Sequence, residues 1–367
     1  MDEKKYLYWL CSIEGIGAVT IRRIREFAGS FGQAYYIEEK KWRESGIFKE
    51  PVLQQMIEGK KNLSRSEEEY HSLKDSGIQF ISAWEPAYPA RLKEIYDYPA
   101  GIFVKGSLPD ESMPSLAIVG ARHCSDYGKD VAEEFAKTLS EAGIQIISGM
   151  AYGIDGAGHR GALKTGKGTF AVLGCGLNIC YPREHYRLYR EIPAKGGLIS
   201  EYLPSIPPKA AHFPMRNRII SGLSQAVLVI EAAEKSGSLI TAELALEQGR
   251  EVFAIPGRIT DVLSQGCNRL IQSGAGAVNG PEDILDYFHL EGEKLLRLRE
   301  KSGKGLAKTE KMVYSCLDLQ PKSLEMVVAE SGASVGECMI ALYELEKMGY
   351  ITRAFGQYYE KKLQVRG

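Results

Sequence analysis

The sequence contains no apolar run that approaches the roughly 20 residues needed to cross a bilayer. Its opening, MDEKKYLYWL, is charged and then mixed, so it lacks the apolar core of a secretory signal peptide. Together these two absences predict a cytoplasmic protein with no membrane-spanning segment.

Paired cysteines are also missing, because the seven cysteines are scattered, odd in number and form no C-x-x-C. This pattern argues against a disulfide framework and a zinc site, and favours reduced thiols. No H-E-x-x-H, no G-x-S-x-G and no histidine pair at metal-ligand spacing is present either. We therefore predict no metal and no cofactor. The cysteines are Cys11, Cys124, Cys175, Cys180, Cys267, Cys316 and Cys338.

The sequence also lacks an excess of charge of one sign. The 46 lysines and arginines nearly balance the 47 acidic residues, which leaves a net charge of −1. A nucleic-acid partner would therefore need positive charge that is gathered locally. The length of 367 residues and the 44% hydrophobic content are those of a globular protein with two or three domains.

Residues 1–75 predict helices without a convincing strand. Within them, SIEGIGAVTIRRIREF places a Gly-Ile-Gly turn before apolar residues at helical spacing. We expect a SAM or helix-hairpin-helix-like domain here. The turn either presents backbone N–H groups to a phosphate or simply joins two core helices, and the sequence leaves both open.

Short apolar runs alternate with helical stretches from residue 78 to residue 289. Six runs predict strands: LAIV, IQIIS, TFAV, GGLIS, QAVLVI and EVFAI, in chain order. Continuous apolar strands that alternate with helices indicate a parallel sheet covered on both faces. We predict an α/β domain with a doubly wound, mostly parallel Rossmann-like sheet, whose ligands lie beyond the C-terminal strand ends.

The chain beyond this domain changes character twice. Residues 290–306 are basic and predict a linker. Residues 307–363 predict three helices and a hairpin that turns at Phe355 and Gly356, which is the pattern of a winged helix.

Two nucleotide motifs nearly match, but neither has the required context. Gly156, Gly158 and Gly161 form a G-x-G-x-x-G that falls inside a predicted helix, and the Walker-like stretch Gly161–Lys167 precedes a strand instead of following one. We therefore predict neither NAD binding nor ATP hydrolysis. Asp155 and His159 lie four residues apart, and we expect them to hydrogen-bond each other and fix a loop, with an acid–base pair as the alternative.

The predicted strand ends gather arginines beside small residues. Arg122, Arg183, Arg216 and Arg218 lie in these loops, and Ser236-Gly237-Ser238 precedes a predicted helix. Guanidinium groups and a helix N-terminus both bind anions. These features predict a phosphate-rich ligand at this edge of the sheet.

The stretches IVGARHCSDYG, ISGMAYGIDGAGHRGAL, AVLGCGLNICYPREH and FPMRNRIISGLSQAVLVIEAAEKSGSLITAELALEQGREVFAIPG together resemble the DNA-processing protein A family (DprA, also called Smf). The resemblance runs from about Tyr88 to Phe288. It implies a cytoplasmic bacterial protein that is not an enzyme. Family members bind and protect incoming single-stranded DNA, form homodimers and load the RecA recombinase during natural transformation.

The resemblance also implies the residues of the site. Ala121 stands where the family more often has Ser, and His185 stands where Asn is often found, so these two contacts differ. We expect Arg216 to reach the strand and Arg218 to brace neighbouring loops, and we expect Arg122→Ala and Arg216→Ala to abolish DNA binding with little change in melting temperature. The predicted DNA-binding residues are Arg122, Gly149, Ala151, Gly153, Arg183, Lys209, Phe213, Arg216, Asn217, Arg218, Ser236, Gly237, Ser238 and Asn268.

Two alternatives stay open. EKSGSLITAE, with Thr241 and Glu243, is similar to the phosphate loop and catalytic glutamate of LOG-type phosphoribohydrolases, so a nucleotide-processing enzyme is one alternative. A duplex-reading regulator that acts through its winged helix is the other. The third helix of that domain has few of the side chains that read base edges, which favours a protein contact.

Overall fold

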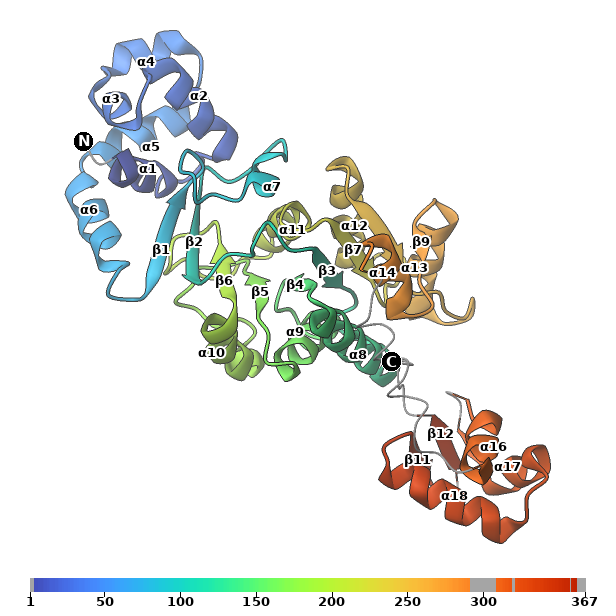
Figure 1. Ribbon diagram of the computed structural model, residues 1–367. Coiled ribbons are helices and arrows are strands. Elements are labelled where there is room, and N and C mark those ends of the chain that lie inside the picture. Colours follow the sequence, from blue (N-terminus) through green and yellow to red (C-terminus); the bar gives the residue numbers. More distant parts are fainter. Residues whose placement is uncertain (1–2, 291–307, 319–320, 357, 362–367) are drawn as a thin grey trace. The chain divides into compact units, whose positions relative to one another are not determined.

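The computed structural model describes residues 3–290, 308–318, 321–356 and 358–361. The chain forms two compact units, Met1–Val278 and Asn279–Gly367, and each is described by itself (Figure 1). The predicted linker, residues 290–306, lies outside the described residues apart from Leu290.

The described part of the first unit contains a nine-stranded sheet in the order β1-β2-β6-β5-β4-β3-β7-β8-β9. β1 pairs with β2, and β2 with β6, in antiparallel register, and every other pair is parallel. The predicted doubly wound, mostly parallel sheet is therefore confirmed. The strands are β1 Ile78–Ser82, β2 Gly101–Gly106, β3 Ser115–Val119, β4 Gln145–Ser148, β5 Thr169–Val172, β6 Gly197–Ser200, β7 Ala226–Val229, β8 Glu251–Ala254 and β9 Gly276–Ala277.

The six strands expected from the sequence are β3 to β8. Sequence reasoning missed β1, β2 and β9. The first two are joined by a stretch whose described helix is only the four-residue α7 (Ala90–Lys93), and β9 has two residues. The strand-helix alternation that reveals a parallel sheet is therefore absent at the β1–β2 edge, and at the other edge β9 is too short to give a strand pattern.

Helices cover both faces of the sheet. α8 (Asp126–Ala142), α9 (Ile154–Lys164) and α10 (Tyr186–Lys195) lie side by side on one face (Figure 1). α11 (His212–Gly222), α12 (Gly237–Glu247) and α13 (Val262–Gln272) share a buried apolar core with β7 and β8 on the other face. Burial on both faces explains why the central strands read as unbroken apolar runs.

The N-terminal helices pack on the antiparallel edge of the sheet. The Tyr8 ring of α1 meets the rings of Phe80 in β1 and Phe103 in β2 edge-on, at centroid distances of 5.8 and 5.9 Å. The Gly-Ile-Gly turn joins α1 to α2, and its Gly15 has a φ of +83°. The domain boundary expected at residues 75–78 would lie between α6 and β1, inside the one compact unit Met1–Val278, and it stays a prediction. The helices are α1 Glu3–Cys11, α2 Ala18–Ala28, α3 Phe31–Tyr36, α4 Glu39–Ser45, α5 Glu50–Lys60 and α6 Leu63–Ser72.

The second unit contains a winged helix, as the sequence predicts. Three helices pack around a buried core that includes Val313, Val327 and Leu345, beside a small sheet in the order β10-β12-β11. Among the described residues no single helix is long and apolar enough to cross a membrane, and α17 with α18 meets that test only as a pair bent by 110°. The elements are α14 Pro281–Tyr287, α16 Lys308–Cys316, β10 Lys322–Ser323, α17 Leu324–Ser331, α18 Val335–Lys347, β11 Ile351–Phe355 and β12 Tyr358–Lys361.

Candidate nucleic-acid interface

Two adjoining cavities, of about 510 and 210 Å³, open at the C-terminal strand ends of the first unit. The larger is lined by the loops that follow β3 and β7. These strands are neighbours, but the chain runs from β3 to β4 on one side and reaches β7 on the other. The larger cavity therefore occupies the topological switch point, where doubly wound sheets bind ligands. Both cavities are lined by Arg122, His123, Ala151, Phe213 and Arg216.

The larger cavity combines cations with a helix N-terminus. Arg122, Lys235 and Asn217 line it, together with Ser236–Ser238 at the start of α12. The Ser236 side chain caps this helix by accepting a hydrogen bond from the Ser238 N–H. A Cβ placed on Gly237 would meet nothing within 4 Å, so a ligand can approach the backbone there. Guanidinium, ammonium and helix N–H groups in one cavity suit a phosphate.

The smaller cavity is aromatic. The Tyr181 and Phe213 rings lie 5.4 Å apart at 33°, and the Arg122 guanidinium lies 5.2 Å from the centre of the Phe213 ring. Gly174 leaves room for this arrangement, since a Cβ there would lie 2.8 Å from the Phe213 ring. Aromatic faces with a guanidinium are surfaces on which bases stack. Arg122 thus joins a cavity suited to phosphate to one suited to a base.

Arg216 lies at both cavities but is bound to the protein. It is 3% exposed, and its Nη1 donates to the Gly149 carbonyl at 2.7 Å and to the Val172 carbonyl. Asp155 accepts hydrogen bonds from the Gly149 and Ala151 N–H groups on the same loop. Burial lowers the pKa of Arg216 to about 10, and burial raises the pKa of Asp155 above its usual range.

Arg216 therefore braces the floor of the cavities. An unchanged melting temperature for Arg216→Ala does not fit these contacts. The substitution removes the donor of the buried Gly149 and Val172 carbonyls and a positive charge that acts on the buried Asp155 carboxylate.

Arg218 points away from both cavities, although it is two residues from Arg216. Its Nε donates to Asp97 at 2.8 Å, and its Nη2 donates to both carboxylate oxygens of Glu201 at 2.8 and 2.7 Å. We therefore leave Arg218 out of the proposed DNA contacts. Two residues are about 200° apart on a helix, which sends these two guanidinium groups in different directions.

The other predicted residues divide into three groups. Gly149 and Ala151 line the smaller cavity, and their contact with DNA stays a prediction. Gly153 and Asn268 instead brace loops: a Cβ on Gly153 would collide with the Ala121 and Arg122 carbonyls, and Asn268 makes two hydrogen bonds to the Gly257 backbone. Arg183 and Lys209 are exposed, but neither is among the residues that line the two cavities.

Sequence reasoning missed His123 and Tyr152 as lining residues. Each directly follows a strand-end stretch already singled out, Gly120–Arg122 or Gly149–Ala151, so adjacency was the available signal.

The hydrogen bond predicted between Asp155 and His159 is wrong. Asp155 binds the Gly149–Ala151 backbone, whereas His159 Nδ1 lies 2.8 Å from Thr169 Oγ1 against the sheet. Burial lowers the pKa of His159 to about 3. Asp155 does fix the loop, as expected, but through the backbone. No group of three or more metal-ligating side chains is placed to hold a metal among the described residues.

With this geometry in hand, comparison with known proteins identifies the family. The model of DNA recombination-mediator protein A matches residues 79–289, and the DprA winged helix domain matches residues 299–357. The chain belongs to the DNA recombination-mediator protein A family.

Curated relatives agree with this family assignment. The Smf protein of Escherichia coli is 41% identical over 292 residues, which is 78% of each chain. The DNA processing protein DprA of Streptococcus pneumoniae is 47% identical over 57% of this chain and 73% of its own length. These relatives support a role in DNA processing and recombination mediation.

Solved structures confirm the fold. The crystal structure of DprA from Streptococcus pneumoniae has a TM-score of 0.68 at 37% identity, and covers 77% of this chain and 97% of that one. A Helicobacter pylori structure that describes the single-stranded DNA binding mode of its DNA processing protein A has a TM-score of 0.51 at 28% identity, and covers 57% of this chain and 95% of that one.

Proposed function

We propose that this protein binds single-stranded DNA at the two cavities, protects the incoming strand and delivers it to the RecA recombinase during natural transformation. The observation that carries the proposal is the position of Arg122. It lies over Phe213 and lines both the larger cavity, which suits a phosphate, and the smaller, aromatic cavity. A backbone phosphate and its neighbouring base need these two surfaces side by side. The single-strand binding mode described for the Helicobacter pylori relative supports the same choice.

The proposed DNA contacts are those that the cavities expose. They comprise Arg122, Asn217, Lys235 and the Ser236–Ser238 backbone for phosphate, with Phe213 and Tyr181 for bases. A protein with a net charge of −1 binds an anionic strand through such a local set of cations. A homodimer would present two such sets of DNA contacts. Once one protomer has bound a strand, the linked second site meets that strand at a raised effective concentration.

Affinity for labelled oligo-dT, measured by fluorescence anisotropy across a salt series, tests the proposal. The logarithm of the association constant should fall linearly with the logarithm of salt concentration, because phosphate contacts release counterions. Arg122→Ala should lower affinity by at least about tenfold, the effect of losing a hydrogen bond to a charged group. Salt-independent binding, or full affinity in Arg122→Ala, would place the site elsewhere.

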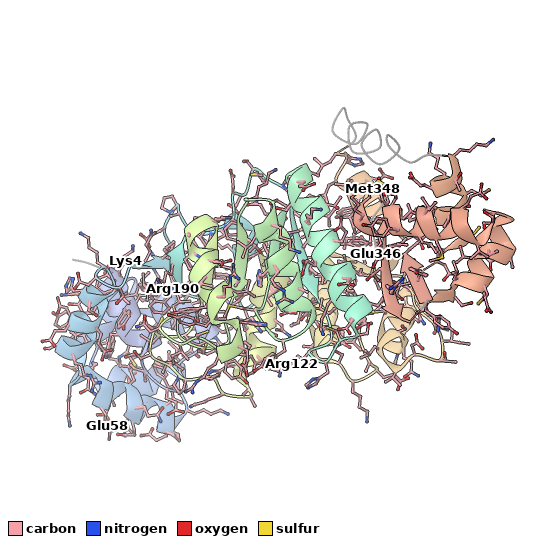
Figure 2. The ribbon with its side chains drawn as sticks, turned by 90° about the horizontal axis from the view of Figure 1, so that it is seen from below. Lys4, Glu58, Arg122, Arg190, Glu346 and Met348 are labelled. Carbon is pink, nitrogen blue, oxygen red and sulfur yellow. The ribbon has the colours of Figure 1, made fainter. Side chains whose placement is uncertain are left out.

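Arg190→Ala is the matched control. It removes the same charge from an exposed position on α10 that does not line either cavity. Figure 2 labels both arginines and shows them on different parts of the sheet unit. The control should bind within about twofold of the parent, as expected for an exposed charge outside a site.

Delivery to the recombinase needs its own measurement. The protein should shorten the lag before RecA hydrolyses ATP on a strand that is coated with single-strand-binding protein. Arg122→Ala should lengthen that lag again. If the parent protein leaves the lag unaltered, it binds DNA without delivering the strand to RecA.

The nucleotide-hydrolase alternative finds less support. Thr241 is buried and lines the larger cavity, but Glu243 lies exposed on α12 and is not among the lining residues. The carboxylate that would have to act on a bound nucleotide is therefore placed outside the cavity.

A further inference from the structure

Glu231 is a buried acid in the loop after β7, and this loop also lines the proposed anion site. It follows β7, is 6% exposed and lies two residues before Ala233, which lines the larger cavity. A carboxylate beside a phosphate site weakens anion binding by repulsion, so its presence there calls for a compensating role.

The contacts of Glu231 hold both ends of one short loop. Its backbone carbonyl accepts a hydrogen bond from the Ala121 N–H at 2.7 Å. Its carboxylate accepts from the Ser125 N–H at 2.8 Å and from the Ser125 hydroxyl at 2.5 Å. Arg122 lies between these two anchored residues, so one acidic residue restrains the loop that carries the central cation of the site.

Neighbouring residues are adapted to this carboxylate. Ser125 caps α8 by accepting a hydrogen bond from the Gly128 N–H at 2.9 Å, which places Glu231 at the positive end of a 17-residue helix. Gly128 leaves the necessary space, because a Cβ there would collide with the Glu231 carboxylate.

We propose that Glu231 is a positioning residue for DNA binding. It acts through the Ala121–Ser125 loop to hold the Arg122 guanidinium over Phe213, where Arg122 lines both cavities. This inference rests on the proposed function. A loop that is restrained before the strand arrives loses less conformational freedom on binding, which increases affinity.

The proposal predicts a change in oligo-dT affinity that is opposite in sign to the change expected from charge alone. Glu231→Gln removes a negative charge near the anion site, so charge alone would tighten oligo-dT binding. Loss of positioning should instead weaken binding by about three- to tenfold, the range expected when one long side chain must be immobilised on binding. The salt dependence should also become shallower by about 0.7 in slope, as one phosphate contact is lost.

Glu234→Gln is the matched control, since Glu234 is exposed on the same loop. It should bind as tightly as the parent or slightly more tightly. Ser125→Ala removes only the hydroxyl partner, so it should weaken binding in the same direction, and it provides the test if Glu231→Gln does not fold.

A double-mutant cycle decides whether Glu231 acts through Arg122. In an Arg122→Ala background, measured at low salt where residual binding persists, Glu231→Gln and Ser125→Ala should each have no further effect. Tighter or unchanged binding by Glu231→Gln in the parent, or an additive loss in the double variant, would overturn the inference. Failure of the parent protein to bind oligo-dT would instead overturn the proposed function, so the two failures are distinguishable.

Discussion

Arg216 and Arg218 have the same side chain, lie two positions apart on α11 and have different surroundings. Arg216 donates to the Gly149 and Val172 carbonyls, while Arg218 donates to the carboxylates of Asp97 and Glu201. Each is almost completely buried, and each donates hydrogen bonds to the protein, but only Arg218 forms ion pairs. At the scale of single residues, burial and partners decide the role of a guanidinium group, and residue type does not.

Burial also decides how His159 responds to pH. Its folded-state pKa is lowered to about 3 from the ordinary value of 6.5, because burial disfavours the charged ring. Between these values the unfolded chain binds more protons than the folded protein, so the free energy of unfolding falls as pH decreases below about 6.5. From pH 8 to pH 5.5 we expect this group to reduce stability by about 1.4 kcal/mol.

Urea unfolding at these two pH values, in the parent and in His159→Asn, measures the effect. The asparagine amide does not titrate, so the variant should lose less stability on acidification. Equal losses in both proteins would assign the acid sensitivity to other groups.

Loops at the ends of parallel strands set the geometry of the site at the scale of elements. The loop after β4 lies against the loop after β3 at Gly153, whose φ is +73°. Asp155 anchors the first loop and Glu231 the second. The cavities thus depend on close backbone contact between loops from neighbouring strands.

Gly153→Ala and Gly166→Ala test this contact, because both glycines have positive φ, +73° and +77°. A Cβ on Gly166 meets nothing within 4 Å, so its replacement should cost only the backbone strain, about 1 kcal/mol. A Cβ on Gly153 collides with the Ala121 and Arg122 carbonyls, so its replacement should cost more and also lower oligo-dT affinity. Equal unfolding free energies, or full affinity in Gly153→Ala, would show that the loops do not need this contact.

The whole molecule divides into a sheet unit that contains both cavities and a second unit with an unusual winged helix. The third helix of a winged helix commonly enters the major groove. Here α18 exposes Met339, Ile340 and Tyr343, at 51%, 69% and 64%. These side chains lack the paired donors and acceptors that read base edges, which favours a protein contact over duplex reading.

Removal of residues 291–367 tests this division of labour. The remaining chain keeps both cavities, so its affinity for oligo-dT should stay within about threefold of the parent. A second linked DNA site would instead contribute a factor of 100 or more. Affinities of both proteins for single- and double-stranded oligonucleotides of equal length give the answer, and a hundredfold loss on either would assign a DNA site to the second unit.

The sequence by itself determined the six central strands, their parallel arrangement, the winged helix and the edge of the sheet at which the two cavities open. These follow from local periodicity, because strands buried on both faces must be continuously apolar and loops at their ends cannot be. Only the tertiary structure decided which polar residues face the cavities. The roles of Arg216, Arg218, Gly153 and Asn268 depend on partners distant in sequence, such as Val172, Glu201 and Ala121. These partners lie in loops at the ends of other strands. Local sequence periodicity does not reveal which of these loops come together in the folded sheet.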